Sequence, residues 1–170
     1  MGTTKSGRYL NTDGSRKSVS DFALVHSNEG DFAWSQLRRN GKTARQIRLA
    51  NGGHGQDGMD LLDKYHIKYN ITKTWSNGVR VGNVPNHKNK IKAKSNMQSW
   101  FPKTWNAKDI KRAGEHVAGL KHNRITPDGK PVYGVYKGVR VGVIRTKGRI
   151  ATIFPDVDQT SVIRRGKKYK

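Results

Sequence analysis

The sequence predicts an α+β domain in which helices precede two antiparallel β units. Three observations support this class: a helical pattern near residue 110, a predicted hairpin near residue 75 and three short β patterns after residue 130. The two β units share the letters Gly-Val-Arg-Val-Gly, at 78–82 and 138–142, directly after a turn in each case. Five common letters are weak evidence for a duplication, so the repeat supports only the fold class and the expectation that two similar units face each other.

Two helices are predicted from the spacing of apolar residues. The longer one is expected between residues 105 and 123, with Asn106 as its cap and Asp109 three residues later, as in a capping box. Its apolar residues recur at helical spacing: Ile110, Ala113, Val117 and Leu120. A shorter helix is expected after the glycine-rich loop 51–55, with Asp57 as its cap. Its apolar face consists of Met59, Leu62 and Tyr65.

The strands are expected to form a hairpin and a meander. Apolar and polar residues alternate over 67–72, which is the period of a half-buried strand, and the turn residues 76–78 lead to a second arm with Val79 and Val81. After the turn at 127–129, short β patterns separated by Lys-Gly pairs predict an antiparallel meander. These patterns cover 132–136, 139–144 and 149–154.

The chain has the length and apolar content of one compact domain. We expect a partly ordered N-terminal extension over 1–37, a folded domain over 38–165 and a basic tail over 166–170. Because no apolar run approaches the roughly 20 residues that span a bilayer, this segment is not expected to insert into a membrane. The N-terminus lacks the apolar core of a secretory signal, so export would depend on another segment. The absence of cysteine excludes disulfides and thiolate chemistry.

The charge of the chain indicates a polyanionic partner. There are 34 Lys and Arg residues against 12 Asp and Glu, which gives a formal net charge of +22. Charge alone does not separate RNA from DNA or from an anionic membrane. No carboxylate occurs from Lys64 to Lys108. This gap disfavours a paired-carboxylate mechanism or a two-metal nuclease, so acid–base chemistry there would depend on His or Lys.

Two histidines are candidates for that chemistry. His54 lies in a glycine loop, where the backbone can approach a phosphate and leave the imidazole exposed. His87 precedes alternating lysines, which in an extended segment would align their ammonium groups as a phosphate-binding track: Lys88, Lys90, Lys92 and Lys94. RNA cleavage without a metal needs a base, an acid and a cation, which two histidines and a lysine supply. The ordinary alternative is that these residues form a solvated basic surface. The remaining histidines rank lower: His26, His66, His116 and His122.

Two further positions have both a structural and a functional interpretation. Residues 99–102 and Trp105 are expected to form core around a turn, with stacking of Trp100 on a nucleobase as the alternative. Thr152 alternates with Ile150 and Phe154 in a strand pattern, so an ordinary strand residue is its default interpretation.

The order of several motifs resembles that of bacterial EndoU ribonuclease domains over roughly residues 40 to 160. The motifs are Gly52-Gly53-His54-Gly55, the segment from Asn77 to Lys88, Gln98 to Pro102 with Trp105, Gly138 to Gly142, and Thr152 to Pro155. The resemblance implies an RNase A-like core and RNA cleavage by attack of the 2′-OH, which leaves a 2′,3′-cyclic phosphate. It implies His54, His87, Lys92 and Thr152 as the catalytic residues, with Lys94 as the second choice for the lysine. Candidate substrate contacts are Lys90, Lys94, Arg80, Phe154 and Trp100. Many members of the family have Tyr where this chain has Phe154.

The same resemblance implies an antibacterial toxin, such as the C-terminal part of a contact-dependent inhibition protein. Such a domain is secreted within a larger exported protein and acts in the target-cell cytoplasm. Its expected partners are RNA, in particular tRNA, and a cognate immunity protein with an acidic surface. No metal or other cofactor is expected, and a manganese dependence is left open. The alternatives are a non-catalytic RNA-binding module and, with less support, a metal-dependent DNA nuclease.

Overall fold

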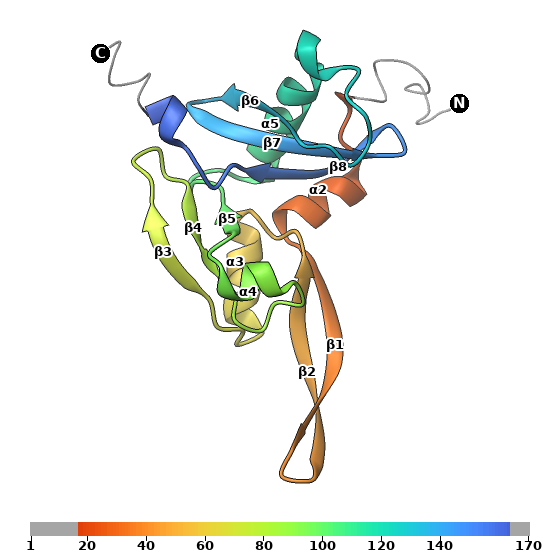
Figure 1. The fold of residues 1–170 in the computed structure, drawn as a ribbon, viewed down its shortest axis with the longest axis vertical. Coiled ribbons are helices and arrows are strands. Elements are labelled where there is room, and N and C mark those ends of the chain that lie inside the picture. The colour runs from red at the N-terminus through yellow and green to blue at the C-terminus, as the bar shows by residue number, and fades with distance from the viewer. Residues whose placement is uncertain (1–16, 164–170) are drawn as a thin grey trace.

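The computed structural model describes residues 17–163 and has the predicted α+β class (Figure 1). The elements are α2 (Asp21–Asn28), β1 (Asp31–Arg39), β2 (Lys42–Asn51), α3 (Gln56–Lys64), β3 (Asn70–Thr74), β4 (Arg80–Asn83), α4 (Lys90–Lys94), β5 (Gln98–Trp100), α5 (Ala107–Gly119), the short 3-10 helix η1 (Lys121–Asn123), β6 (Val132–Tyr136), β7 (Val139–Thr146) and β8 (Arg149–Pro155). Within the described range they form three antiparallel sheets, β1–β2, β3–β4–β5 and β6–β7–β8. None of the helices in that range is long and apolar enough to cross a membrane.

The C-terminal sheet and helix α5 form the larger core. Strands β6, β7 and β8 pair in the predicted meander, with β7 in the middle. Helix α5 packs on all three strands. A Cβ atom at Gly114 would lie 2.4 Å from Ile153 Cδ1, so the absence of a side chain lets the helix approach the sheet. Ile110 and Val117 are fully buried in the resulting core.

The predicted cap of α5 is confirmed, whereas the predicted cap of α3 is wrong. The Asn106 side chain accepts a hydrogen bond from the Asp109 amide, and the Asp109 carboxylate accepts one from the Asn106 amide, both at 3.0 Å. Helix α3 begins at Gln56 after Gly55, so Asp57 lies inside the first turn. The Asp57 carboxylate accepts a hydrogen bond from the Asn28 side chain at 2.8 Å and does not cap the helix.

The middle sheet contains the predicted hairpin, with β5 added on the other side of β4. The expected alternation holds only in part. Ile67 is buried, but it precedes the strand, and Ile71 is 43% exposed. A register shift between Ile71 and Lys73 interrupts the period of two.

The two copies of Gly-Val-Arg-Val-Gly occupy corresponding places in the fold. Each copy includes the end of a turn and the first residues of the middle strand of a three-stranded sheet, β4 in one case and β7 in the other. The two units meet where the Ser99 hydroxyl on β5 donates a hydrogen bond to the Pro155 carbonyl on β8, at 2.7 Å. The Asn77 side chain adds a second link through the Gly138 carbonyl, at 3.0 Å.

Residues 17–37, which the sequence assigned to an extension, contain α2 and most of β1. Helix α2 packs on β8 and α5, and its residue Ala23 is buried in the larger core. The hairpin β1–β2 extends away from the rest of the molecule (Figure 1). Its turn is Asn40-Gly41, and both residues have positive φ angles. Asn-Gly between two extended segments is a strong hairpin signal, which the irregular apolar pattern of this region obscured.

We expect Asn106→Ala to lower the free energy of unfolding by about 1 kcal/mol, because α5 loses its side-chain cap. Urea unfolding followed by circular dichroism would measure the change. Lys108→Ala is a matched control in the same helix, since Lys108 is exposed. Equal stability of Asn106→Ala and Lys108→Ala would show that the capping box contributes nothing to the fold.

Candidate active site

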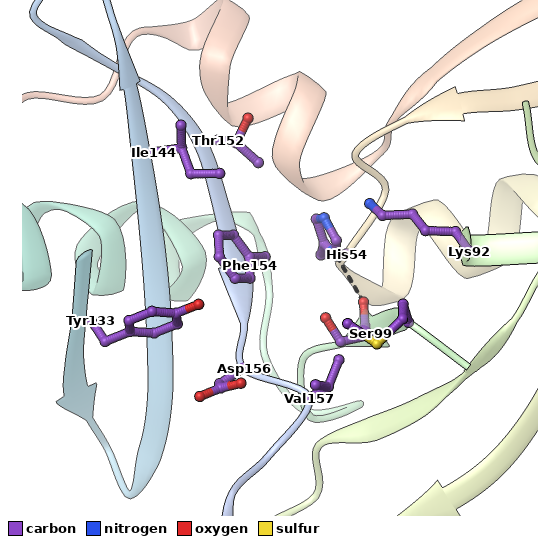
Figure 2. A pocket seen from close by; sticks show the side chains of 10 residues that line it. His54, Lys92, Ser99, Tyr133, Ile144, Thr152, Phe154, Asp156 and Val157 are labelled. Atoms are coloured by element: carbon purple, nitrogen blue, oxygen red, sulfur yellow. Dashed lines mark hydrogen bonds between the residues drawn. The ribbon is translucent and has the colours of Figure 1, made fainter. Parts of the chain in front are cut away.

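A cavity of about 320 Å³ lies where the two β units meet (Figure 2). The C-terminal sheet supplies one side, with side chains from all three of its strands. The loop after β2, helix α4 and the region of β5 supply the other side. The lining residues are His54, Lys92, Met97, Ser99, Tyr133, Ile144, Thr152, Phe154, Asp156 and Val157. Three of the four predicted catalytic residues, His54, Lys92 and Thr152, therefore share one cavity.

The loop that carries His54 is held by backbone hydrogen bonds on both sides. The His54 amide donates to the Ser27 carbonyl of α2 at 2.6 Å, and the His54 carbonyl accepts from the Phe101 amide after β5 at 2.7 Å. Gly52 has a φ of +67°, and a Cβ atom there would lie 2.0 Å from the His26 carbonyl oxygen. The sequence suggested an exposed imidazole, but this packing leaves His54 only 3% exposed.

The hydrogen bonding of His54 determines which ring nitrogen is basic. The Nδ1 atom lies 2.8 Å from the Ser99 carbonyl oxygen, which can only accept, so Nδ1 carries a proton (Figure 2). Burial lowers the pKa of His54 well below its ordinary value of 6.5, and the charge of Lys92 lowers it further. The ring is therefore neutral near pH 7, with its lone pair on Nε2. This is the state that a general base requires.

Lys92 reaches the cavity from a short helix, so the expected extended row of lysines is wrong. Residues 90–94 form α4, capped by the Asn89 side chain, which accepts from the Ile91 amide at 2.9 Å. The helical turn separates the lysines: Lys92 is half-buried and extends toward His54 in Figure 2, while Lys90 and Lys94 are exposed. Burial lowers the pKa of the Lys92 ammonium. Among these lysines, Lys92 is thus the one that lines the cavity.

His87 is not among the residues that line the cavity. Its side chain is buried, with 2% exposure, and its Nδ1 accepts a hydrogen bond from the Asn89 amide at 2.8 Å. Its Nε2 has no hydrogen-bond partner among the described residues. Burial, assisted by the charges of Lys92 and Arg48, lowers the pKa of His87 to about 4. Because His87 does not line the cavity, a structural role is favoured for this imidazole, and its catalytic role stays a prediction.

His26 is the residue that the sequence analysis ranked low and the structure brings to the site. Its Nε2 lies 3.2 Å from the Thr152 hydroxyl, and its Nδ1 lies 2.6 Å from the Asp31 carboxylate. The Gly53 amide donates to the His26 carbonyl at 3.0 Å, so the two histidines sit on directly bonded segments. His26 belongs to the last turn of α2. No local pattern marks it, because its partner Thr152 lies 126 positions away in the sequence.

Aromatic side chains form the other wall of the cavity. The rings of Phe154 and Tyr133 meet edge to face, with centroids 6.0 Å apart. The Arg140 guanidinium lies 4.1 Å from the Tyr133 ring centroid and forms an ion pair with Asp156. Burial raises the pKa of Tyr133, and the charge of Asp156 adds to this. Phe154 has no hydroxyl group, but Tyr133 supplies a phenol hydroxyl on the same wall. Tyr133 was not among the residues predicted from the sequence.

Two predicted substrate contacts are wrong. Trp100 is fully buried in the smaller core, where its ring lies 5.9 Å from that of Tyr69, so no nucleobase can reach it. Arg80 is 8% exposed, and its guanidinium donates to the Gln56 side chain at 2.8 Å and to the Phe101 carbonyl. Through these bonds Arg80 links β4 to the start of α3 and to the segment after β5.

An imidazole, an ammonium group and a hydroxyl around one cavity, with a second imidazole bonded to that hydroxyl, are typical of an acid–base nuclease. Within residues 17–163, no group of three or more His, Asp or Glu side chains is arranged to hold a metal ion. A family model described as bacterial EndoU nuclease matches residues 26–157, which is more than half of the chain. The chain therefore belongs to this family, and it is an endoribonuclease-type enzyme whose substrate is RNA. Neither the curated proteins nor the solved structures give a match to this chain.

We expect His87→Asn to flatten the pH dependence of stability, because the Asn oxygen can still accept from the Asn89 amide but does not titrate. In the wild type the unfolded chain binds a proton at an ordinary pKa of 6.5, whereas folded His87 has a pKa of about 4. Stability is therefore fully present above pH 6.5 and is lost as the pH falls toward 4. His87 accounts for roughly 2–3 kcal/mol of that loss.

Urea unfolding of both proteins between pH 7.5 and 4 would measure this difference. His122→Asn is the matched control, since His122 is exposed. A pH profile of His87→Asn that runs parallel to the wild type would contradict the buried neutral imidazole.

Proposed function

We propose that this protein cleaves RNA without a metal, by attack of a ribose 2′-OH on the adjacent phosphorus. The observation that carries the proposal is the neutral, Nδ1-protonated His54 beside the Lys92 ammonium and the Thr152 hydroxyl, with His26 bonded to that hydroxyl. In this proposal His26 takes the place of His87, which the family resemblance implied as the second catalytic histidine. The charge of +22 supplies general affinity for the polyanion.

Each group has one task in this reaction. His54 Nε2 accepts the proton of the 2′-OH as the 2′ oxygen bonds to phosphorus. The bond from phosphorus to the 5′ oxygen of the next nucleotide breaks, and protonated His26 gives its Nε2 proton to that oxygen. The products are a 2′,3′-cyclic phosphate and a free 5′-OH, with no net change in protons. Lys92 stabilises the negative charge that develops on the phosphorane oxygens.

Thr152 and Asp31 hold His26 for this task. The Asp31 carboxylate accepts a hydrogen bond from Nδ1–H at 2.6 Å, which orients the ring and gives a charged imidazole an anionic partner. The Thr152 hydroxyl lies 3.2 Å from Nε2, which holds this nitrogen beside a residue that lines the cavity. This arrangement repeats the carboxylate, imidazole and hydroxyl order of hydrolase triads, although here the hydroxyl positions the ring and does not attack.

We expect His54→Ala and His26→Ala each to lower the cleavage rate by about 100-fold or more, since each removes one proton-transfer step. Total bacterial RNA in chelator, with mapping of fragment ends for cyclic phosphates, would measure rate and reaction type together. His122→Ala is the matched histidine control. Filter binding of uncleavable RNA should change little in either variant.

Three results would overturn parts of this assignment. Binding of RNA by the wild type without strand scission would support the alternative of a non-catalytic RNA-binding module. Cleavage that requires added Mn²⁺ would contradict the metal-free mechanism. Loss of activity in His87→Asn but not in His26→Ala would show that His87, and not His26, is the second catalytic histidine.

We further propose that the protein is an antibacterial toxin and that its RNA substrate is tRNA. Disabling translation needs few turnovers of a small enzyme, and a strongly basic domain is matched by an immunity protein with an acidic surface. In this proposal the domain is the C-terminal part of a larger exported protein and acts in the target-cell cytoplasm. The toxin role and its partners rest on the family resemblance and on charge.

Induced expression in a bacterial cytoplasm should arrest growth, whereas His54→Ala expressed to the same level should not, because arrest depends on RNA cleavage. Sequencing of RNA ends from the arrested cells would identify the substrate. Cyclic phosphate ends concentrated in tRNA would support the proposal. Unimpaired growth with active enzyme present, or cuts spread evenly over all RNA classes, would contradict it.

A further inference from the structure

A second cavity, of about 430 Å³, lies on the other side of the His26–Thr152 pair. It is formed by α2 and by residues at the β7–β8 turn and along β8. Its lining residues are Ser20, Phe22, Ala23, His26, Asp31, Thr146, Arg149, Ile150, Ala151 and Thr152. Thr152 lines both cavities, so they adjoin at this one side chain.

The two cavities divide the proposed catalytic groups between them. His54 and Lys92 line the first cavity and His26 lines the second. In the proposed reaction the attacking and leaving oxygens lie on opposite sides of the phosphorus, so the base and the acid must also act from opposite sides. A phosphate beside Thr152 would present its 2′-OH side to His54 and its 5′-oxygen side to His26.

We propose that the second cavity is a binding subsite for the nucleoside on the 3′ side of the scissile phosphate, the one that leaves with the 5′-OH. This inference rests on the proposed function. It extends that function by giving the enzyme a two-nucleotide footprint, with the 2′-OH nucleoside in the first cavity and the leaving nucleoside in the second.

The chemistry of the second cavity suits a nucleoside. Phe22 in the first turn of α2 is 83% exposed, which is unusual for a large apolar ring and leaves its face open to a base. Stacking of bases on aromatic side chains tolerates any base, as a general ribonuclease subsite requires. Arg149 places a cation at the same cavity, and arginine is a common contact for nucleic-acid phosphates. His26 and Thr152 form the wall nearest the reacting atoms.

The test compares two substrates that differ only in the leaving group. One is a dinucleoside monophosphate, and the other is the same 5′ nucleoside with its 3′-phosphate esterified by methanol. Both need an acid to protonate the leaving oxygen, but only the first has a base for the second cavity. We expect Phe22→Ala to lower kcat/KM for the dinucleotide by about tenfold and to leave the methyl ester unchanged.

Two controls separate stacking from indirect effects. Val25→Ala alters the same helix at a residue that is 49% exposed and does not line the cavity, and it should change neither rate. Phe22→Trp keeps an aromatic face and should retain cleavage of the dinucleotide. Thermal unfolding should show that Phe22→Ala folds normally, since its side chain is exposed.

Each other outcome has a distinct meaning. Equal losses on both substrates would show that Phe22 acts through the position of His26, which would overturn the subsite. Wild-type rates for Phe22→Ala on both substrates would show that no base stacks there, and would overturn it as well. A wild-type enzyme that cleaves neither these substrates nor cellular RNA would overturn the proposed function itself.

Discussion

The site depends on a row of three backbone hydrogen bonds between the end of α2 and the loop after β2. The amides of Gly53, His54 and Gly55 donate to the carbonyls of residues 26, 27 and 28, at 3.0, 2.6 and 3.0 Å. Because the bonds are backbone to backbone, they fix the relative position of the two main chains that carry His26 and His54. Gly52 makes the contact possible, since any side chain there would collide with the His26 carbonyl. His26 and His54, which are 28 positions apart in the sequence, are thereby held on two directly bonded segments.

Burial of His54 sets its chemistry. A histidine exposed on a loop of so basic a protein would stay close to its ordinary pKa and titrate near neutrality. Packing between α2, β5 and the C-terminal sheet desolvates His54, and the Lys92 ammonium adds its charge, so the pKa falls and the ring stays neutral. The Ser99 carbonyl then selects the tautomer with Nε2 free. Burial and the charge of Lys92 thus favour a neutral His54, and the hydrogen bond to Ser99 leaves Nε2 as its unprotonated nitrogen.

The sequence predicted those parts of the molecule that depend on local pattern. The capped helix α5, the meander β6–β7–β8 and the hairpin β3–β4 are all present, because apolar period and turn residues specify them within short windows. His54, Lys92 and Thr152, which the family resemblance implied as catalytic residues, line one cavity. The assignments that failed depend on distant contacts: Trp100 and Arg80 are buried by segments that no local window reveals.

His26 could not be predicted from the sequence for the same reason. Its imidazole is marked as a site residue only by its contact with Thr152 on β8, and it lies near His54 only because the loop after β2 bonds to α2. The lysine row failed for a different reason. Alternate lysines fit an extended strand, but the Asn89 cap begins a helical turn at that point, and a turn of helix sends neighbouring lysines in different directions.

The final glycine of the repeated Gly-Val-Arg-Val-Gly segment has a different structural role in each copy. Both final glycines lie in a middle strand, and neither has room for a Cβ atom. At Gly82 the space is taken by the Asn70 carbonyl, 1.7 Å from where the Cβ would be, so that glycine lets β3 lie close to its antiparallel partner β4. At Gly142 the space is taken by the rings of Phe154 and Tyr133, whose nearest atoms lie 2.4 and 2.9 Å from that point. The absence of a side chain lets the strands of a hairpin lie close together in one sheet. In the other sheet it lets two aromatic rings lie over the strand and form a wall of the cavity that His54 lines.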